Sequence, residues 1–413
     1  MNYENTCVRG GVFYLPAAEN MARWPIVACD QYTAQKDRWE EADRAAGDGP
    51  SSLRLILPEA YLDEAEARLP HVHAAMRDYL RRDVLRPAVN GMVLVQRDTQ
   101  SGSRLGLVAT IDLEAYDYAP GARSLIRPTE GTIVSRIPPR LRIRRDAPLE
   151  LSHVMLLLDD AKRTVIEPMH RLRDRLRPLY DVSLPLGGGR LRGWAIETKE
   201  ALGQIDGALG ALLAALPKDG IFLAVGDGNH SLATAKAHWQ ELQKSLPPAA
   251  WADHPARYAT VEINNIYDDA LVFEPIHRVV FGQTPEAVMA MLAPARLKPT
   301  NGAPDLTIVS AAGETPLRIG NPLHPLPVGT VQALLDAHSP RLDYIHGADA
   351  VRQLVRTENA VGVLLPPMRK DMLFPAVAQG GPLPRKTFSM GEANEKRYYM
   401  EARRIVKTDA EEK

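Results

Sequence analysis

The segment with the clearest chemical potential is Gly226-Asp227-Gly228-Asn229-His230, which joins a short apolar run to a helical pattern. Residues 221–225 show no polar alternation, as in a strand buried on both faces, and residues 230–244 have helical spacing. A strand that ends in glycines and opens a helix presents backbone N–H groups and the positive end of the helix dipole, which favour a phosphate or carboxylate. Asp227 could also hold a divalent metal ion, and His230 could donate to a phosphate oxygen.

Two phosphate-binding fingerprints do not fit this junction. The order Gly226-x-Gly228-x-x-Ser231 lacks the third glycine of a dinucleotide-binding turn, and the Gly-Lys-Ser/Thr of a P-loop is missing. An ordinary strand-to-helix turn, in which Asp227 or Asn229 caps the helix, explains the same residues without a ligand. The spacing alone leaves both interpretations open.

A second candidate is the block Arg127-Pro128-Thr129-Glu130, with Arg136 and Arg140 following. The arginines would hold the Glu130 carboxylate in its ionised form, and guanidinium groups are natural partners of a polyphosphate. The alternative is a solvated basic face with one structural ion pair, which the sequence by itself favours.

Two later segments complete the candidates. His277 and Arg278 stand at the end of a predicted strand, where a single histidine is more often a core residue than a ligand. Lys386 lies in the loop of residues 384–392, whose cationic groups and glycine could line a pocket or belong to the surface.

The composition excludes several classes of protein. The 413 residues are 45% hydrophobic, so neither a disordered chain nor a disulfide-stapled miniprotein is expected. With 50 basic and 51 acidic residues the formal charge is −1, which does not favour a nucleic-acid coat. No apolar run approaches the roughly 18 residues of a membrane span, so we expect a cytoplasmic protein with free thiols at Cys7 and Cys29.

The order of predicted elements is that of a mixed α/β protein. Motifs of zinc hydrolases and serine acyl-transfer enzymes are missing from the sequence. Predicted strands cover residues 12–15, 24–29, 221–225, 258–266, 271–280 and 361–365, a hairpin covers 91–112, and helices cover 59–82, 198–216, 230–244, 331–337 and 350–356. We place regions at 1–190, 191–300 and 301–413, with Gly187-Gly188-Gly189 as a flexible joint.

Several of these motifs together resemble the bacterial and archaeal family called domain of unknown function 1015. The segment GDGNHSLATAKA is similar to that family's Asp-Gly-His-His-Arg-Tyr-Glu-Thr-Ala hallmark. Residues 52–59 look like its early strand, 127–130 like its Arg-x-x-Glu block, and 275–278 and 384–387 like its later signatures. The motifs follow in one order over nearly the whole chain, which makes the resemblance specific.

The resemblance implies a ParB/sulfiredoxin-like core with additional α/β elements. In such folds the corresponding loop cradles the phosphates of a nucleotide, and some ParB-like relatives are free-serine kinases. Asp227, Gly228, Asn229 and His230 would then contact phosphate or metal. Asn229 replaces the first histidine of the hallmark and Ser231 replaces its arginine, so another arginine must supply the phosphate clamp. We expect Arg127 and Arg136 or Arg140 to point toward His230, with Glu130 nearby.

The function we expect is a nucleotide-dependent phosphotransferase acting on a small hydroxyl compound such as serine or, in reverse, phosphoserine. Its cofactors would be ATP or ADP, with CTP as an option, and Mg²⁺. A homodimer is an option, and no membrane partner is expected. The alternatives are a ParB-like nucleotide-binding switch or nucleic-acid-associated protein without small-molecule turnover, and a non-catalytic metabolite sensor. The expected catalytic residues are Glu130, Asp227 and His230, with Asp227 as the metal ligand; the expected nucleotide-binding residues are Gly226, Gly228, Asn229, Ser231, Arg127, Arg136, Arg140, His277, Arg278 and Lys386.

Overall fold

The computed structural model describes residues 6–407, which form two compact units. The first unit contains residues 6–128, 132–271 and 392–407, and the second contains residues 129–131 and 272–391. This division differs from the regions expected from the sequence, because the end of the chain returns to the first unit. The predicted mixed α/β class is confirmed, whereas the ParB/sulfiredoxin-like core stays a prediction.

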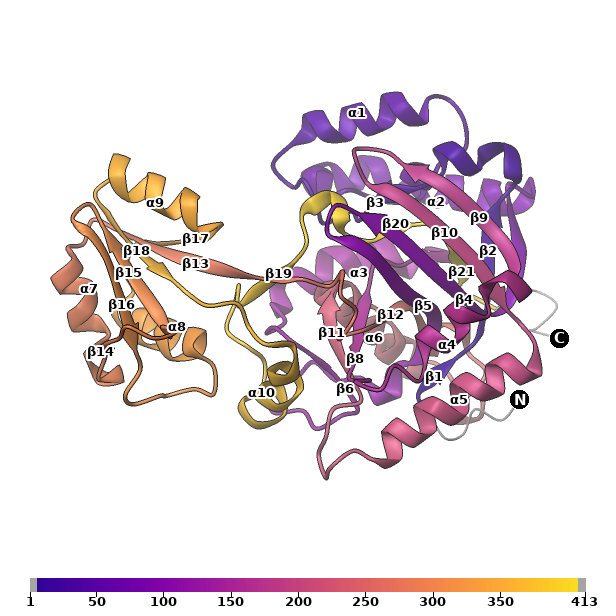
Figure 1. Ribbon diagram of the computed structural model, residues 1–413. Helices are drawn as coiled ribbons and strands as arrows, with labels where there is room; N and C mark the ends of the chain where they lie inside the picture. The colour runs from indigo at the N-terminus through magenta and orange to yellow at the C-terminus, as the bar shows by residue number, and fades with distance from the viewer. Residues whose placement is uncertain (1–5, 408–413) are drawn as a thin grey trace. The chain divides into compact units, whose positions relative to one another are not determined.

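A twelve-stranded mixed sheet is the framework of the first unit (Figure 1). Its central path runs β6-β11-β8-β12-β5-β4-β2-β21-β7, with β1 on β5 and β10 joining β4 to β9. The strands are β1 (Val8–Arg9), β2 (Gly11–Pro16), β4 (Leu85–Thr99), β5 (Gly102–Asp112), β6 (Ile126–Pro128), β7 (Leu149–Leu151), β8 (Met155–Leu158), β9 (Arg177–Leu184), β10 (Gly189–Ile196), β11 (Leu223–Asp227), β12 (Tyr258–Asn265) and β21 (Ala402–Arg404). A separate pair consists of β3 (Ile26–Val27) and β20 (Tyr398–Tyr399).

Two hydrophobic cores lie on opposite faces of this sheet. Along β4, Val93 and Val95 belong to one core, whereas Met92 and Leu94 belong to the other, as the two-residue period of a strand requires. The first core includes residues of α1 and α2, and the second includes residues of α4, α5 and α6. The helices of this unit are α1 (Lys36–Ala46), α2 (Ala65–Arg81), α3 (Ile137–Arg145), α4 (Ile166–Arg171), α5 (Lys199–Ala214) and α6 (Asn229–Gln243).

The second unit has a sheet of its own, in the order β14-β16-β15-β18-β13-β17, with β19 paired to β13. Val351 and Val355 of α9 pack with Val279 and Val309 of the strands in a small apolar core. The elements are β13 (Phe273–Phe281), β14 (Lys298–Pro299), β15 (Leu306–Ser310), β16 (Gly313–Arg318), β17 (Leu342–His346), β18 (Ala360–Leu364), β19 (Phe388–Met390), α7 (Pro285–Met291), α8 (Pro327–His338), α9 (Ala348–Thr357) and α10 (Leu373–Gly380).

The predicted strand–glycine–helix unit is confirmed. β11 is a buried strand between β6, with which it runs parallel, and β8, with which it runs antiparallel, and it leads into α6. The predicted hairpin is also present as β4 and β5. Within residues 6–407 no helix has the length and apolar character needed to cross a bilayer.

Two local predictions are wrong. The resemblance implies an early strand at residues 52–59, but Ser52–Leu55 form a 3₁₀ helix whose first turn begins where Ser51 Oγ accepts from the Leu53 N–H. The Gly187–Gly189 segment is not a joint between regions. It is the turn between β9 and β10, where Gly187 and Gly189 take φ values of 73° and 80° that suit glycine.

Candidate functional site

The junction between β11 and α6 is shaped by Gly228. Its φ of 78° lies in the left-handed region, and a Cβ there would approach the Val154 Cα to 3.0 Å. Gly226, two residues before Gly228, lies at a register shift between β11 and β8. Among the described residues no side chain caps α6 at Gly228, and the anion site expected at the start of this 15-residue helix stays a prediction.

Asp227 does not cap the helix. Its Oδ1 accepts a hydrogen bond of 2.8 Å from the neighbouring Gly228 N–H, and its Oδ2 lies 3.3 Å from the Lys396 ammonium. Both side chains of this ion pair are mostly buried, at 21% and 15% exposure. Lys396, which the sequence analysis missed, therefore adds a positive charge at the end of β11.

His230 is held as a neutral imidazole. Its Nε2 accepts from the Ile133 N–H at 3.2 Å, which places the ring proton on Nδ1. Burial, together with the positive charges of Arg140 and Arg136, lowers the pKa of His230 to about 4. His230 can therefore donate to a phosphate oxygen only through Nδ1, and it adds no charge at neutral pH.

The two nearby arginines differ in availability. Arg140 donates to the Arg136 carbonyl at 2.7 Å and forms an ion pair with Glu59. Arg136 is exposed, and its positive charge still helps to lower the pKa of His230. Arg136 is therefore the better candidate for the phosphate clamp.

A group that the sequence analysis missed lies beside this junction: the buried His153 and Tyr399 and the partly buried Asp30. His153 Nε2 lies 3.5 Å from Asp30 Oδ2, and His153 Nδ1 is 2.7 Å from the Tyr399 hydroxyl. The Cδ2 atom of His153 lies 3.3 Å from where Gly228 would carry a Cβ, so this group adjoins the start of α6.

Asp30 and His153 form an ion pair. Burial alone would lower the pKa of His153, but the charge of Asp30 raises it well above its usual value. Burial would likewise raise the pKa of Asp30, but His153 and the more distant Lys396 bring it well below its usual value. The imidazolium can then donate from both nitrogens, to Asp30 and to the Tyr399 oxygen.

Arg127 was expected to face His230, but the structure engages it elsewhere. Its guanidinium donates to the backbone carbonyls of Ser124, Asp219 and Gly220, at 2.7, 2.6 and 3.2 Å. Asp219 and Gly220 precede β11, whereas His230 follows the other end of that strand. These bonds give Arg127 a structural role in holding the loop before β11.

The remaining predicted residues belong to the second unit. Glu130 accepts from the Lys386 N–H at 3.2 Å, and the fully buried Arg278 donates to the carbonyls of Arg385 and Lys386 at 3.1 and 3.0 Å. The structure thus brings Glu130, Arg278 and the exposed Lys386 together around one loop. His277 is a core residue: its Nδ1 accepts from the Leu365 N–H at 3.1 Å, and burial lowers its pKa to about 4.

A metal ion at this junction would find one carboxylate, that of Asp227. Residues 6–407 contain no group of three or more His, Cys, Asp or Glu side chains arranged to hold a metal. Mg²⁺ usually takes only one or two protein carboxylates and completes its shell with phosphate oxygens and water. The Asp227 carboxylate, oriented by Gly228 and Lys396, fits that role.

The chain belongs to the family described as Protein of unknown function (DUF1015), whose profile matches residues 13–405. No curated protein matches it. Among solved structures, it is similar to a free serine kinase in complex with AMP, at 12% identity and a TM-score of 0.39, covering 74% of this chain and 93% of that one.

Two further solved structures show a similar degree of likeness. A conserved hypothetical protein from Pyrococcus furiosus is 12% identical with a TM-score of 0.34, covering 71% of this chain and 90% of that one. SbnI from Staphylococcus aureus, truncated at its C-terminus, is 12% identical with a TM-score of 0.36, covering 69% and 83%. TM-scores this low transfer no function to this chain.

Proposed function

We propose that this protein is a nucleotide-dependent phosphotransferase that acts on a small hydroxyl compound such as serine, or on phosphoserine in the reverse direction. The observation that carries the proposal is the start of α6, where Gly228 leaves the helix without a side-chain cap among the described residues. Lys396 and Arg136 add positive charge there, and the Asp30–His153 pair adjoins it. Phosphoryl transfer depends mainly on such positioning and charge neutralisation.

In this proposal the nucleotide phosphates bind the backbone N–H groups at the start of α6. The Nδ1–H of His230 donates to a phosphate oxygen, and Arg136 neutralises charge on the transferred group. Asn229 and Ser231 belong to the same first turn and complete the predicted nucleotide contacts. When bound, Mg²⁺ would be held by Asp227 and would neutralise phosphate charge.

The acceptor hydroxyl needs a carboxylate that orients it and accepts its proton. Glu130 remains the predicted residue for this role. Asp30 is a second candidate, because its carboxylate acts on both Lys396 and His230 electrostatically and stays ionised. The variants Glu130→Gln and Asp30→Asn distinguish the two candidates. Substitution of the residue that orients the acceptor should lower kcat and leave nucleotide affinity unchanged.

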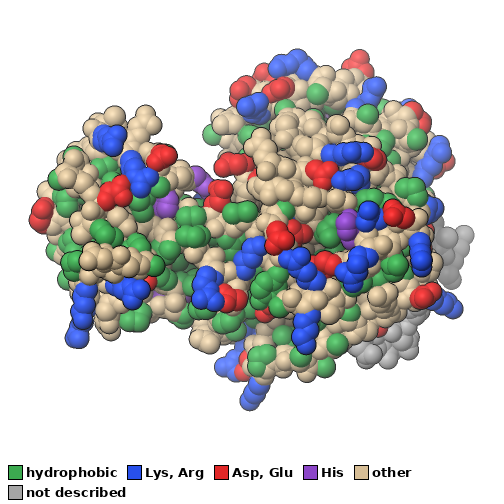
Figure 2. Space-filling model, viewed as in Figure 1, with side chains coloured by type: hydrophobic (Ala, Val, Ile, Leu, Met, Phe, Trp, Pro, Cys, Tyr) green, Lys and Arg blue, Asp and Glu red, His purple; other side chains and the backbone are tan. Residues whose placement is uncertain are grey.

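The nucleic-acid alternative is weakened by the arginines of α3. Four of them pair with carboxylates of the same unit, which reduces the positive field that a phosphate backbone would meet. Basic and acidic side chains are also interspersed on the face drawn in Figure 2. The pairs are Arg140–Glu59, Arg142–Glu66, Arg144–Glu150 and Arg145–Glu241.

The test is a thermal-shift series with ATP, ADP, CTP and phosphoserine, with and without Mg²⁺, followed by ³¹P NMR of ATP with serine. A ligand that binds the native state raises Tm in proportion to the logarithm of its concentration over Kd. We expect a Mg²⁺-dependent shift with at least one nucleotide and the appearance of a phosphoserine resonance. A Tm unchanged by every nucleotide would reject the proposal, and affinity for DNA that falls steeply with salt would support the alternative.

A further inference from the structure

The backbone that carries Lys396 is fixed to the β4–β5 hairpin of the large sheet. Glu395 accepts from the backbone N–H and from the hydroxyl of Ser101, in the turn of that hairpin, at 2.9 Å each. Arg97 of β4 donates to the Asn394 carbonyl, also at 2.9 Å. The two residues before Lys396 are therefore held by the same hairpin, one through its side chain and the other through its backbone.

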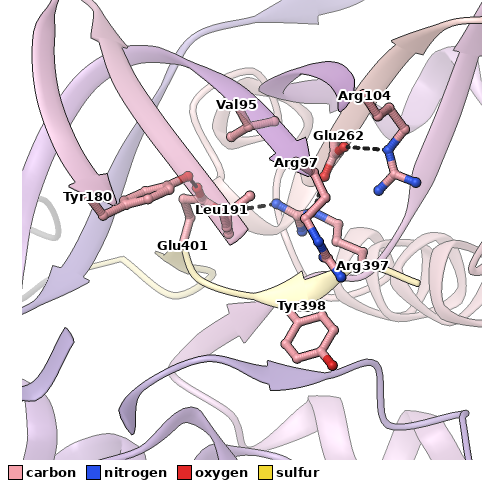
Figure 3. A pocket seen from close by; sticks show the side chains of 9 residues that line it. All are labelled: Val95, Arg97, Arg104, Tyr180, Leu191, Glu262, Arg397, Tyr398 and Glu401. Atoms are coloured by element: carbon pink, nitrogen blue, oxygen red, sulfur yellow. Dashed lines mark hydrogen bonds and ion pairs between the residues drawn. The ribbon is translucent and has the colours of Figure 1, made fainter. Parts of the chain in front are cut away.

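The residue after Lys396 is anchored inside the first unit (Figure 3). Arg397 is 3% exposed and donates to Glu262 of β12 and to Glu401, at 2.9 Å each. The Nε of Arg104 faces the other oxygen of Glu262 at 3.8 Å. Breaking a buried ion pair is strongly destabilising, so the backbone around Lys396 keeps its place. Lys396 thus extends from a fixed point, and its flexible four-carbon side chain can still adjust to a ligand.

The ammonium of this lysine lies beside the start of α6. It is 3.3 Å from Asp227 Oδ2, and 15% of the lysine side chain is exposed. Asp227 directly precedes Gly228, the N-cap residue of α6. The positive end of a helix disfavours a nearby cation and favours an anion. Asp227 balances the Lys396 ammonium, which leaves the positive helix end without an anion of its own.

Positive charge exceeds negative charge around this helix start. Three cations each have one carboxylate partner, in the pairs Lys396–Asp227, His153–Asp30 and Arg140–Glu59. The exposed Arg136 adds a further positive charge that acts on His230. Together with the helix end, this charge favours an additional anion at the junction.

We propose that Lys396 binds a phosphate of the nucleotide. An ammonium carries three N–H donors, so Lys396 can keep Asp227 as one acceptor and donate to a phosphate oxygen with another. That phosphate is the one that accepts from the backbone N–H groups at the start of α6. In the absence of a metal ion, Asp227 orients the ammonium. This inference rests on the proposed nucleotide binding and adds to it a residue from the end of the chain.

The alternative is that Lys396 only neutralises Asp227, and a double-mutant cycle separates the two roles. The full chain is titrated calorimetrically with ADP in EDTA, which keeps Mg²⁺ away from Asp227. We expect Lys396→Met to raise the Kd of ADP about tenfold, both in the wild-type protein and in the Asp227→Asn variant, because the phosphate contact is lost in both. A counter-ion role predicts no effect of Lys396→Met in the Asp227→Asn variant, and that result would overturn the proposal.

The cycle also guards against an unfolded variant. Lys396→Met alone leaves Asp227 without its partner, whereas the double variant removes both charges and should fold. Lys244→Met is the matched control, because it removes an exposed lysine at the opposite end of α6. It should bind ADP as the wild-type protein does. An equal loss of affinity in Lys244→Met and Lys396→Met would show a general effect of charge and overturn the direct contact.

The outcomes distinguish this inference from the proposed function. A wild-type protein that binds no nucleotide, with or without Mg²⁺, rejects the proposed function and this inference with it. An ADP affinity that is unchanged in Lys396→Met rejects this inference and leaves the proposed function intact. ADP that binds only in the presence of Mg²⁺ also rejects the Lys396 contact, because the metal ion rather than the ammonium then holds the phosphate.

Discussion

Lys396 places its ammonium 3.3 Å from Oδ2 of Asp227, and so connects the last segment of the first unit to the end of β11. The same ammonium helps to lower the pKa of Asp30. One lysine therefore influences both carboxylates beside the start of α6. In the proposed reaction Asp227 would hold the metal ion, and Asp30 is a candidate for orienting the acceptor hydroxyl.

The first prediction concerns Asp227→Asn. An asparagine Oδ1 can still accept from the Gly228 N–H, but the mostly buried Lys396 loses its charged partner, so the unfolding free energy should fall by about 1–3 kcal/mol. The neutral asparagine amide binds Mg²⁺ more weakly than the Asp227 carboxylate does. We expect calorimetric titration to show loss of the Mg²⁺-dependent part of nucleotide binding. Wild-type affinity and turnover in this variant would leave Asp227 a purely structural residue.

Gly228→Ala should destabilise the protein. The left-handed φ and the 3.0 Å approach to Val154 together predict a loss of about 1–3 kcal/mol in urea unfolding. Gly203→Ala is the matched control, because Gly203 lies inside α5 with open space around its Cβ position. Alanine there should raise stability by about 0.5–1 kcal/mol. Equal effects at both positions would contradict the geometry described for Gly228.

The Asp30–His153 pair predicts a defined pH dependence of stability. Because the pKa of His153 is raised on folding, its contribution is present below the unfolded value of about 6.5 and is lost as pH rises through the folded pKa. Because the pKa of Asp30 is lowered, its contribution is present above about 3.9 and is lost as pH falls through the folded pKa. Both contributions are therefore complete between about pH 4 and 6.5.

NMR of the His153 ring checks this account. In the wild-type protein the ring should remain an imidazolium at pH 7.5, and in Asp30→Asn it should become neutral because burial then dominates. The variant should also lose about 2 kcal/mol or more of stability at pH 6. A wild-type ring that titrates near pH 6.5 would show that the pair does not form.

Arg136 and Arg140 should respond differently to substitution by glutamine. Arg140→Gln leaves the mostly buried Glu59 without its partner, so stability should fall by about 1–3 kcal/mol. Arg136→Gln changes an exposed residue, so stability should stay within about 0.5 kcal/mol while nucleotide affinity falls about tenfold. Urea unfolding and nucleotide titration of both variants separate the two roles, and unchanged affinity in Arg136→Gln would remove it as the phosphate clamp.

The fold around the junction could be read from the sequence because its signals are local. The apolar run of β11 indicates a strand buried on both faces, and the following glycine and apolar spacing indicate the start of α6. The strand that the resemblance implies at residues 52–59 is not formed, because the Ser51 hydroxyl accepts a hydrogen bond from the Leu53 N–H and favours a 3₁₀ turn over extension.

The site could be predicted only in part, because half of it comes from distant segments. Asp30, His153, Lys396 and Tyr399 stand in unremarkable local sequence, and the pairings of β8 with β11 and of β3 with β20 bring them together. A cue was present in Lys396-Arg397-Tyr398-Tyr399, where cationic and aromatic residues are concentrated. For Arg127 the sequence suggested a phosphate contact, whereas in the structure its side chain donates to backbone carbonyls.

The most direct measurement of the central claim is a backbone amide NMR titration of ¹⁵N-labelled protein with ADP and Mg²⁺, with adenosine as the control. We predict that the amides of Gly228, Asn229 and His230 shift saturably with ADP and not with adenosine, because the phosphates accept hydrogen bonds at the start of α6. If ADP leaves these three amides unchanged at concentrations that saturate binding elsewhere, or does not bind, the phosphate site proposed here is wrong.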